Sequence, residues 1–236
     1  LLESFGIDYV FQLKFDEKLS KLTAEEYIQD ILIDGLGVVS FIVGNDWRFG
    51  HKRKGDFAML QAWGAKHNFE VLETAAYERN GLRISSTFIR EQLATGDFFL
   101  VEQLLGRPYS IKGEVVKGQQ LGSTIGFPTC NVNPQRQTLP LQGVFACEVR
   151  LVDVFLPAVV NIGYRPTVTD SVEAVLEAHI LDFDQEIYGR TIEIIFKEKV
   201  RDEIKFDGLE SLKKQIAIDV AQVRDLLDKK QKIAEV

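Results

Sequence analysis

The spacing of apolar residues changes character close to the middle of the chain. In the first half, helical spacing alternates with short continuous apolar runs. Thr23 with Glu26 three residues later is the pattern of a capping box, and apolar residues at helical spacing follow it until Gly35 or Gly37. The run VVSFIV at 38–43 predicts a strand buried on both faces, as in a parallel sheet. A second helical pattern and another short strand follow, an alternation typical of an α/β domain.

Two short helices are predicted over residues 85–106, because a capping residue precedes each helix and a glycine follows it. Ser85 or Ser86 caps the first helix, and Asp97 caps the second. The character of the sequence changes immediately afterwards, so we predict a domain boundary at 106–108.

The second half consists of strand-like segments separated by turns, which predicts an antiparallel barrel or sandwich. These segments are IKGEVV, GVFACEVRLV, PAVVNIG, EAVLEAHIL and TIEIIFKEKV. One long helix ends the chain, with Asp207 and Glu210 as a variant capping box and an apolar stripe expected to lie on the barrel. The stripe consists of Leu209, Leu212, Ile216, Val220, Val223 and Leu227. We therefore divide the chain into domains at 1–106 and 107–236.

The composition leaves this picture unchanged but excludes several functions. The 236 residues are 45% hydrophobic and 27% charged, as in an ordinary globular protein. A net charge of −7 argues against a protein that coats nucleic acid. No apolar run is long enough to cross a bilayer, and the start of the chain lacks a signal-peptide pattern. The two cysteines have no spacing typical of disulfides or metal sites, so we expect a cytoplasmic protein without nucleic-acid or membrane partners.

A glycine-rich segment carries the most informative chemistry. Gly118, Gly122 and Gly126 recur every four residues, and glycines let a backbone bring N–H donors close to phosphate oxygens. Thr129 and Asn131 follow, and on an extended chain they share one face. Their hydroxyl and amide oxygens suit Mg²⁺ bound beside nucleotide phosphates. From the residues alone, a glycine-rich hairpin with two polar surface side chains is the more common explanation.

A carboxylate in the strand pattern at 173–183 is the second candidate. Alternate residues of this segment are apolar, whereas Glu177 and His179 lie on the other face. A carboxylate on a strand that borders a cleft can act as a general base. The alternative is a solvated outer face of the sheet, which is the default for a lone glutamate.

These segments together resemble the riboflavin kinases. The signature GxxxGxxxGFPTCN is followed, in the order and spacing of that family, by GVF, NIGYRPT, YG and RDEIKFDGLESLKKQI. The resemblance covers nearly all of 107–230. It implies a six-stranded Greek-key barrel with a C-terminal helix, Mg²⁺–ATP bound at Thr129 and Asn131, and Glu177 as the catalytic base.

The same resemblance implies roles for further residues. Flavin contacts are expected at Glu177 and Arg201. Nucleotide contacts are expected at Gly113, Gly118, Gly122, Gly126, Thr129, Asn131, Tyr188 and Gly189. Two residues depart from the family pattern. Cys130 stands where alanine is usual, and Ser123 stands where arginine or lysine is common, which weakens one expected phosphate contact.

Residues 1–106 resemble the adenylyltransferase half of bacterial bifunctional FAD synthetases, through GNDWRFGHKRKGD and ISSTFIR. The resemblance implies a partial Rossmann-like, nucleotidyltransferase-like α/β domain with site residues Asp46, Phe49, Ser85, Ser86, Thr87 and Arg90. A helix start with an arginine one turn in suits a phosphate, although a plain N-cap with a solvated arginine is the simpler explanation. The family's first strand and its H-x-G-H motif are missing, so we expect a fragment.

The predicted function is the ATP-dependent phosphorylation of riboflavin to FMN with Mg²⁺, and the predicted partners are the small molecules riboflavin, FMN and ATP. FAD synthesis is expected of intact relatives, whereas this chain is expected to make little or no FAD. The alternative is a flavin- or nucleotide-binding module that has lost catalysis. The presence of Thr129, Asn131 and Glu177 counts against that alternative.

Overall fold

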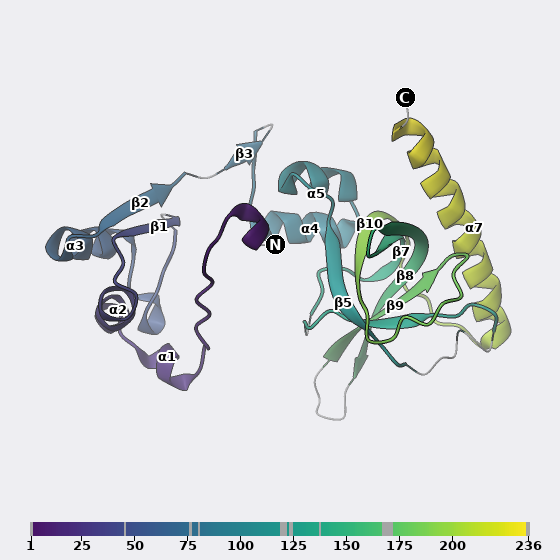
Figure 1. Ribbon diagram of the computed structural model, residues 1–236, viewed down its shortest axis with the longest axis horizontal. Coiled ribbons are helices and arrows are strands. Elements are labelled where there is room, and N and C mark those ends of the chain that lie inside the picture. Colours follow the sequence, from purple (N-terminus) through teal and green to yellow (C-terminus); the bar gives the residue numbers. More distant parts are fainter. Residues whose placement is uncertain are drawn as a thin grey trace. The chain divides into compact units, whose positions relative to one another are not determined.

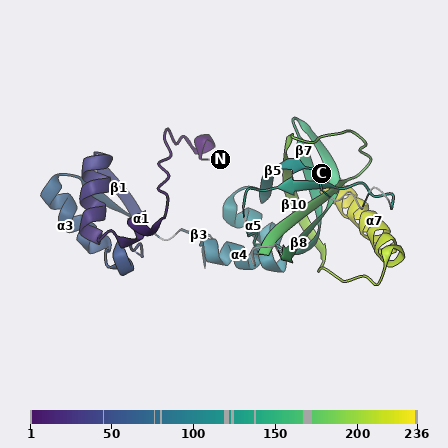
Figure 2. The ribbon, with the colours of Figure 1, turned by 90° about the horizontal axis from the view of Figure 1, so that it is seen from below.

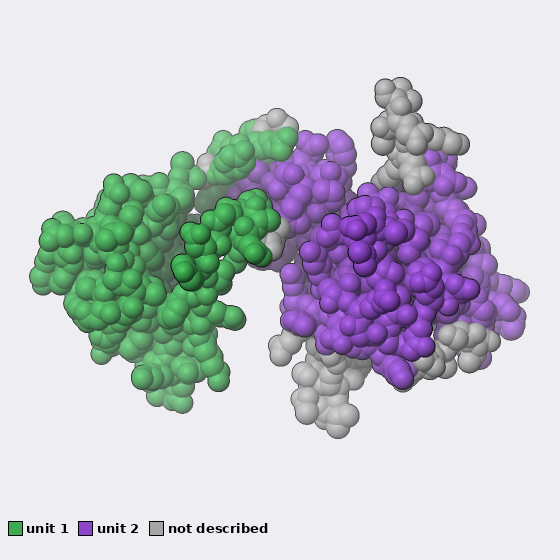
Figure 3. Space-filling model, in the orientation of Figure 1, with its two compact units in different colours: residues 1–83 green, residues 84–236 purple. Residues whose placement is uncertain are grey.

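The computed structural model describes residues 2–234 except 45, 76, 80, 119–121, 123–124, 137 and 167–171. Ser123 and Thr167, which belong to the two kinase-like signatures, therefore lie outside the described residues. The chain forms two compact units, residues 1–83 and residues 84–236 (Figure 3), and each unit has a hydrophobic core of its own.

Unit 1 contains short helices and a two-stranded parallel sheet. Its elements are η1 (Glu3–Phe5), α1 (Glu17–Lys21), α2 (Ala24–Glu26), η2 (Tyr27–Gly35), β1 (Ser40–Gly44), η3 (His51–Arg53), α3 (Phe57–His67), β2 (Glu70–Thr74), β3 (Glu78–Arg79) and β4 (Leu82–Arg83). The predicted capping box is confirmed. Thr23 Oγ1 accepts a hydrogen bond from the Glu26 N–H at 3.1 Å, and Glu26 Oε2 accepts one from the Thr23 N–H at 2.8 Å. The helix then continues as the π-helical segment η2 and ends at Gly35, as predicted.

The parallel sheet of unit 1 is covered on one face. Phe41, Val43 and Val71 pack against a core formed by η2, α3 and neighbouring residues. Ile42 and Leu72 are paired partners on β1 and β2, and they are 61% and 40% exposed. The prediction of a strand buried on both faces is therefore wrong, because the helices of this unit cover only one side of its two strands.

Unit 2 begins with the helices α4 (Ser86–Thr95) and α5 (Phe98–Leu105). Their caps are confirmed: Ser85 Oγ accepts from the Phe88 N–H at 3.1 Å, and Asp97 Oδ1 accepts from the Leu100 N–H at 2.9 Å. The ring of Phe98 lies against two aromatic rings of the barrel, with centroids 5.8 and 5.7 Å away. Because of this packing, the helix pair belongs to the same compact unit as the barrel.

The strands of unit 2 form a closed barrel (Figure 1). Its six antiparallel strands follow the order β10-β5-β6-β9-β8-β7. The strands are β5 (Ser110–Val116), β6 (Cys130–Asn133), β7 (Gly143–Leu151), β8 (Val154–Pro166), β9 (Val172–Ile180) and β10 (Thr191–Arg201). The predicted six-stranded barrel is therefore confirmed. Alternate apolar residues of every strand fill its interior, because successive side chains of a strand point to opposite faces.

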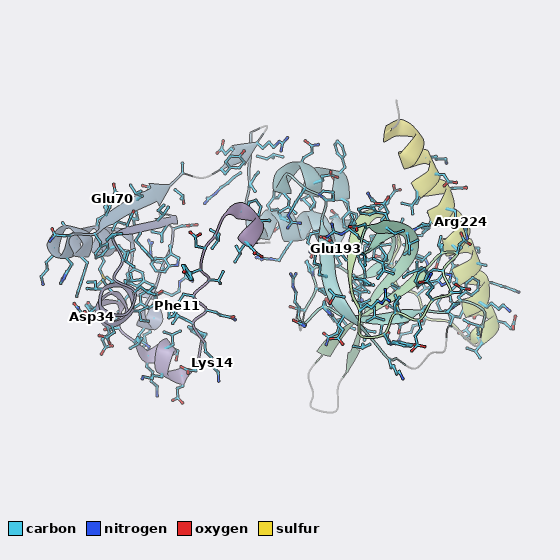
Figure 4. All side chains as sticks on the ribbon, viewed as in Figure 1. Phe11, Lys14, Asp34, Glu70, Glu193 and Arg224 are labelled. Atoms are coloured by element: carbon cyan, nitrogen blue, oxygen red, sulfur yellow. The ribbon has the colours of Figure 1, made fainter. Side chains whose placement is uncertain are left out.

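The C-terminal helix α7 (Leu209–Ala234) lies along the outside of the barrel (Figures 1 and 2). The Gly208 carbonyl accepts from the Leu212 N–H, so Gly208 precedes the first turn and the predicted cap at Asp207 is wrong by one residue. Further along, Val223 and Leu227 are buried against the barrel. Arg224, labelled in Figure 4, forms a two-pronged ion pair with Asp182 at 2.6 and 2.7 Å.

Candidate active site

One row of directly paired residues crosses five strands of the barrel. Asn131 on β6 pairs with Glu177 on β9, Glu177 with Asn161 on β8, Asn161 with Val144 on β7, and Val144 with Arg201 on β10. All five residues line a cavity of about 280 Å³. The closed barrel thus brings together three site residues, Asn131, Glu177 and Arg201, that the sequence separates widely.

The glycine loop packs against the two candidate metal ligands. Thr129 lines the same cavity from the position just before β6. A Cβ on Gly118 would overlap the amide nitrogen of Asn131, and a Cβ on Gly122 would lie 3.1 Å from Thr129 Oγ1. Gly126 has a φ of 88°, a conformation that other residues rarely adopt. The repeat therefore needs glycine for close approach at two positions and for its backbone conformation at the third.

An oxygen of Asn131 remains unsatisfied in the site. Among the described residues, Asn131 Oδ1 is buried and has no hydrogen-bond partner, which costs free energy unless a ligand meets it. Thr129 and Asn131 together offer neutral oxygens that fit a hard cation. No group of three or more His, Cys, Asp or Glu side chains could hold a metal anywhere in the described ranges. Water and phosphate oxygens would therefore have to complete the coordination of such a cation.

Glu177 projects from β9 into the cavity. Its strand neighbours Leu176 and Ala178 are buried in the barrel core, so the predicted alternation of this strand is confirmed. Asn131 and Asn161 lie opposite Glu177 on the two adjacent strands. A half-buried carboxylate on a strand between two amides is positioned to accept a proton from a hydroxyl group in the cavity.

Arg201 is held by a buried carboxylate of α7. Asp219, which is 2% exposed, accepts from Arg201 Nε at 3.0 and 3.1 Å and from Nη2 at 2.7 Å. Gln215 Nε2 donates to the same carboxylate at 2.9 Å, and Arg201 Nη1 donates to the Asp202 carbonyl at 2.9 Å. The guanidinium therefore borders the cavity with its charge already paired and its orientation fixed.

The first half of α7 gives the cavity an apolar wall. Leu209, Leu212 and Ile216 line it, together with Phe206 from the preceding segment. Leu209 is 57% exposed, although it belongs to the predicted apolar stripe. The stripe is therefore divided: its second half packs on the barrel, whereas its first half leaves apolar surface facing a cavity.

A second cavity, of about 320 Å³, lies beside the first. Pro128, Cys130 and Tyr188 line it, and Lys117 Nζ lies 5.7 Å from the centre of the Tyr188 ring. Thr129 borders both cavities. The two spaces thus meet at the candidate metal ligand.

At two of the predicted nucleotide-binding glycines, the local backbone structure alone explains why glycine is needed. Gly113 lies so close to the β6 backbone that a Cβ would collide with Val132 and Asn133, and it lines neither cavity. Gly189 follows Tyr188 in a turn with a φ of 74°. The assignment of Gly113 to the nucleotide stays a prediction that its position does not support.

Comparison with known proteins gives matches to two family models. The family described as "Flavokinase: Riboflavin kinase" matches residues 105–227, and the family described as "FAD_syn: FAD synthetase" matches residues 1–88. The bifunctional riboflavin kinase/FMN adenylyltransferase of Escherichia coli (strain K12) is 44% identical over 225 residues, which are 95% of this chain and 72% of that protein. The chain belongs to the bifunctional riboflavin kinase/FMN adenylyltransferase family.

Further members and a solved structure extend the comparison. The family member from Pseudomonas fluorescens is 45% identical over 221 residues, or 94% of this chain and 71% of that protein. A crystal structure described as a macrolide-efflux protein from Streptococcus pneumoniae matches 94% of this chain and 72% of its own, with 30% identity and a TM-score of 0.71. Within the described residues, no helix is long and apolar enough to cross a membrane.

The division of the chain can be drawn at three places. The two family matches end at residue 88 and begin at residue 105, whereas the compact units meet between Arg83 and Ile84. The boundary at 106–108 inferred from the sequence stays a prediction. The helices α4 and α5 are the segment in dispute, because they pack on the barrel but precede the riboflavin kinase match.

The predicted adenylyltransferase residues fall in both units. In unit 1, Asp46 is exposed and lies 3.5 Å from Arg83 in an ion pair. Phe49 is 5% exposed and stacks on Trp47, and its assignment to a substrate site stays a prediction. The other four residues lie at the start of α4 in unit 2. Ser85 caps the helix, Ser86 and Thr87 form its first turn, and Arg90 Nη2 donates to Thr87 Oγ1 at 3.4 Å.

Sequence reasoning missed four polar residues that line the cavity, one of which is Glu203, just after β10. Asn161 belongs to the NIGYRPT motif, His179 lies two residues after Glu177, and Asp219 lies four residues after Gln215 on α7. The strand alternation already placed His179 on the face of Glu177. In contrast, nothing in the local pattern distinguishes Asp219 from the other acidic residues of a solvated helix.

Proposed function

We propose that unit 2 transfers the γ-phosphoryl group of ATP to the 5′-hydroxyl of the ribityl chain of riboflavin, which yields FMN and ADP. The observation that carries this proposal is that Glu177 lines one cavity together with the apolar residues of α7 and with Thr129 and Asn131. Membership in the riboflavin kinase family supports the same reaction.

The two cavities suit the two substrates. A flavin ring is flat and has broad apolar faces, and Leu209, Leu212 and Ile216 offer these faces an apolar surface in the first cavity. The second cavity, with Tyr188, would take the nucleotide. Because Thr129 borders both spaces, the phosphates would lie where the two substrates meet. Positioning of this kind is the main contribution of a protein to phosphoryl transfer.

Thr129 and Asn131 would hold Mg²⁺, and the unsatisfied Asn131 Oδ1 supports this assignment. When bound, Mg²⁺ neutralises the charge on the phosphate oxygens. Glu177 would accept the proton of the 5′-hydroxyl. The hydroxyl oxygen would bond to the γ-phosphorus while the bond from that phosphorus to ADP breaks. Arg201 would border the flavin, held in place by Asp219.

The experiment is incubation of the chain with riboflavin, ATP and Mg²⁺, followed by chromatographic separation of FMN and FAD. Glu177→Gln keeps the shape of the side chain but removes the base, so we expect turnover to fall by ~10²–10⁴-fold with riboflavin binding retained. Glu114→Gln, on the exposed face of β5, is the matched control. A chain that binds riboflavin and ATP but releases no ADP would instead be the flavin- or nucleotide-binding module.

A further inference from the structure

His179 joins strand β9 to the segment that carries Thr129. His179 Nδ1 lies 2.7 Å from the carbonyl oxygen of Pro128. Since a carbonyl can only accept, Nδ1 carries the proton and donates it. The imidazole also meets the ring of Phe127 edge-on, with the centroids 5.6 Å apart and the planes at 83°. One side chain therefore contacts two successive residues that lead into the candidate metal site.

The segment held by His179 lies outside the regular hydrogen bonding of the barrel. Strand β6 begins at Cys130, so Thr129 precedes its ladder. Pro128 has no N–H, and its carbonyl is the one backbone group through which hydrogen bonds can anchor it. His179 donates its hydrogen bond to that carbonyl. This hydrogen bond fixes Pro128, the residue next to Thr129. The donor, His179, lies on the same strand and face as Glu177.

We infer that His179 is a positioning residue for the metal–nucleotide complex. By holding Pro128 against β9, it keeps the Thr129 hydroxyl beside Asn131 in the geometry that a hard cation requires. Because Mg²⁺ tolerates little deviation from its preferred geometry, a loose Thr129 weakens the metal complex more than it weakens nucleotide binding without metal. This inference rests on the proposed riboflavin kinase function.

The test is titration calorimetry without riboflavin, so that no turnover occurs. His179→Leu removes the donor, and we expect ADP binding in the presence of Mg²⁺ to weaken by about 10- to 100-fold, the usual effect of losing a residue that orients a metal ligand. ADP binding without Mg²⁺ is expected to stay unchanged. His179→Asn places an amide N–H near the position of Nδ1, and it should restore most of the affinity for Mg²⁺–ADP.

A matched control is available in unit 1. His51 Nδ1 also contacts a backbone carbonyl, that of Ser20 at 3.0 Å, so His51→Leu removes the same kind of bond without touching the kinase cavity. Kinetics supply a second measurement: for His179→Leu, the Mg²⁺ concentration for half-maximal rate should rise, and turnover at saturating Mg²⁺ should approach that of wild type.

The outcomes separate the inference from the function on which it rests. Wild-type chain that makes no FMN would overturn the proposed function. Active wild type, with His179→Leu folded and unchanged in Mg²⁺–ADP affinity, would overturn the role of His179. Equal losses in the Leu and Asn variants, or equal losses with and without Mg²⁺, would also overturn it, because the donated bond would then not be what matters.

Discussion

The ion pair between Arg201 and Asp219 offers a sharp test of how α7 is held on the barrel. Asp219→Asn keeps the size of the side chain but removes the charge that Arg201 needs. Asp219 is 2% exposed and accepts hydrogen bonds from both Arg201 and Gln215, so water cannot easily replace the hydrogen bonds of its carboxylate. We expect Asp219→Asn to destabilise unit 2 and to weaken riboflavin binding, because Arg201 then loses its fixed orientation.

The expected loss in the free energy of unfolding follows from the burial of the Arg201–Asp219 ion pair. Removing one partner of a buried ion pair costs about 3–5 kcal/mol, since the other charge is left unpaired. The side chain of Arg201 is 20% exposed and keeps its bond to the Asp202 carbonyl, which places the expected cost near the lower value, about 3 kcal/mol. For a domain of this size, that cost lowers the unfolding midpoint by about 6–12 °C.

The assay is thermal unfolding followed by circular dichroism and by tryptophan fluorescence. Both tryptophans, Trp47 and Trp63, lie in unit 1, so their fluorescence follows the unit that the substitution leaves untouched. Arg201→Met should cost a similar amount. The double variant Arg201→Met/Asp219→Leu should cost less than the sum of the single changes by about 2 kcal/mol, because no buried charge remains unpaired.

Two results would contradict this reasoning. The first is an unchanged dichroism midpoint for Asp219→Asn, which would mean that the pair contributes nothing in solution. The second is strict additivity in the double variant, which would mean that the two side chains do not interact. A shift in the tryptophan signal would show that the perturbation reaches beyond unit 2.

Three further predictions concern the two candidate metal ligands and the two cysteines. Changing Thr129 to Val and Asn131 to Leu should abolish the kinase activity, and excess Mg²⁺ should partly restore it. The circular dichroism spectrum should stay that of the folded chain. An unchanged dependence of the rate on Mg²⁺ would show that neither residue is a ligand. Burial raises the pKa of Cys130 to about 11, so its alkylation should be slow at pH 8 and rise about tenfold per pH unit up to pH 10, as measured by intact mass. Buried Cys147 should react only after unfolding.

Local sequence patterns were enough to predict most of the helices and strands and some of the polar residues that line the first cavity. The caps at Thr23, Ser85 and Asp97 are confirmed, because capping is decided by residues three positions apart. The alternation around Glu177 is confirmed for the same reason, since strand periodicity is local. The exposed face of β1 could not be predicted, because whether an apolar strand is covered depends on elements distant in the sequence.

The proposed metal ligands and base can be recognised in the sequence, as a glycine repeat, a threonine and an asparagine two positions apart, and a glutamate on an alternating strand. The other polar side chains that line the same cavity are recognised from the folded barrel. Asn161 pairs with Glu177 on the neighbouring strand, and Asp219 contacts Arg201 from α7, 18 residues further along the chain. The physical reason is the closure of the barrel. Register partners are fixed by pairing between distant segments, and a local pattern contains no information about which distant segment supplies the partner.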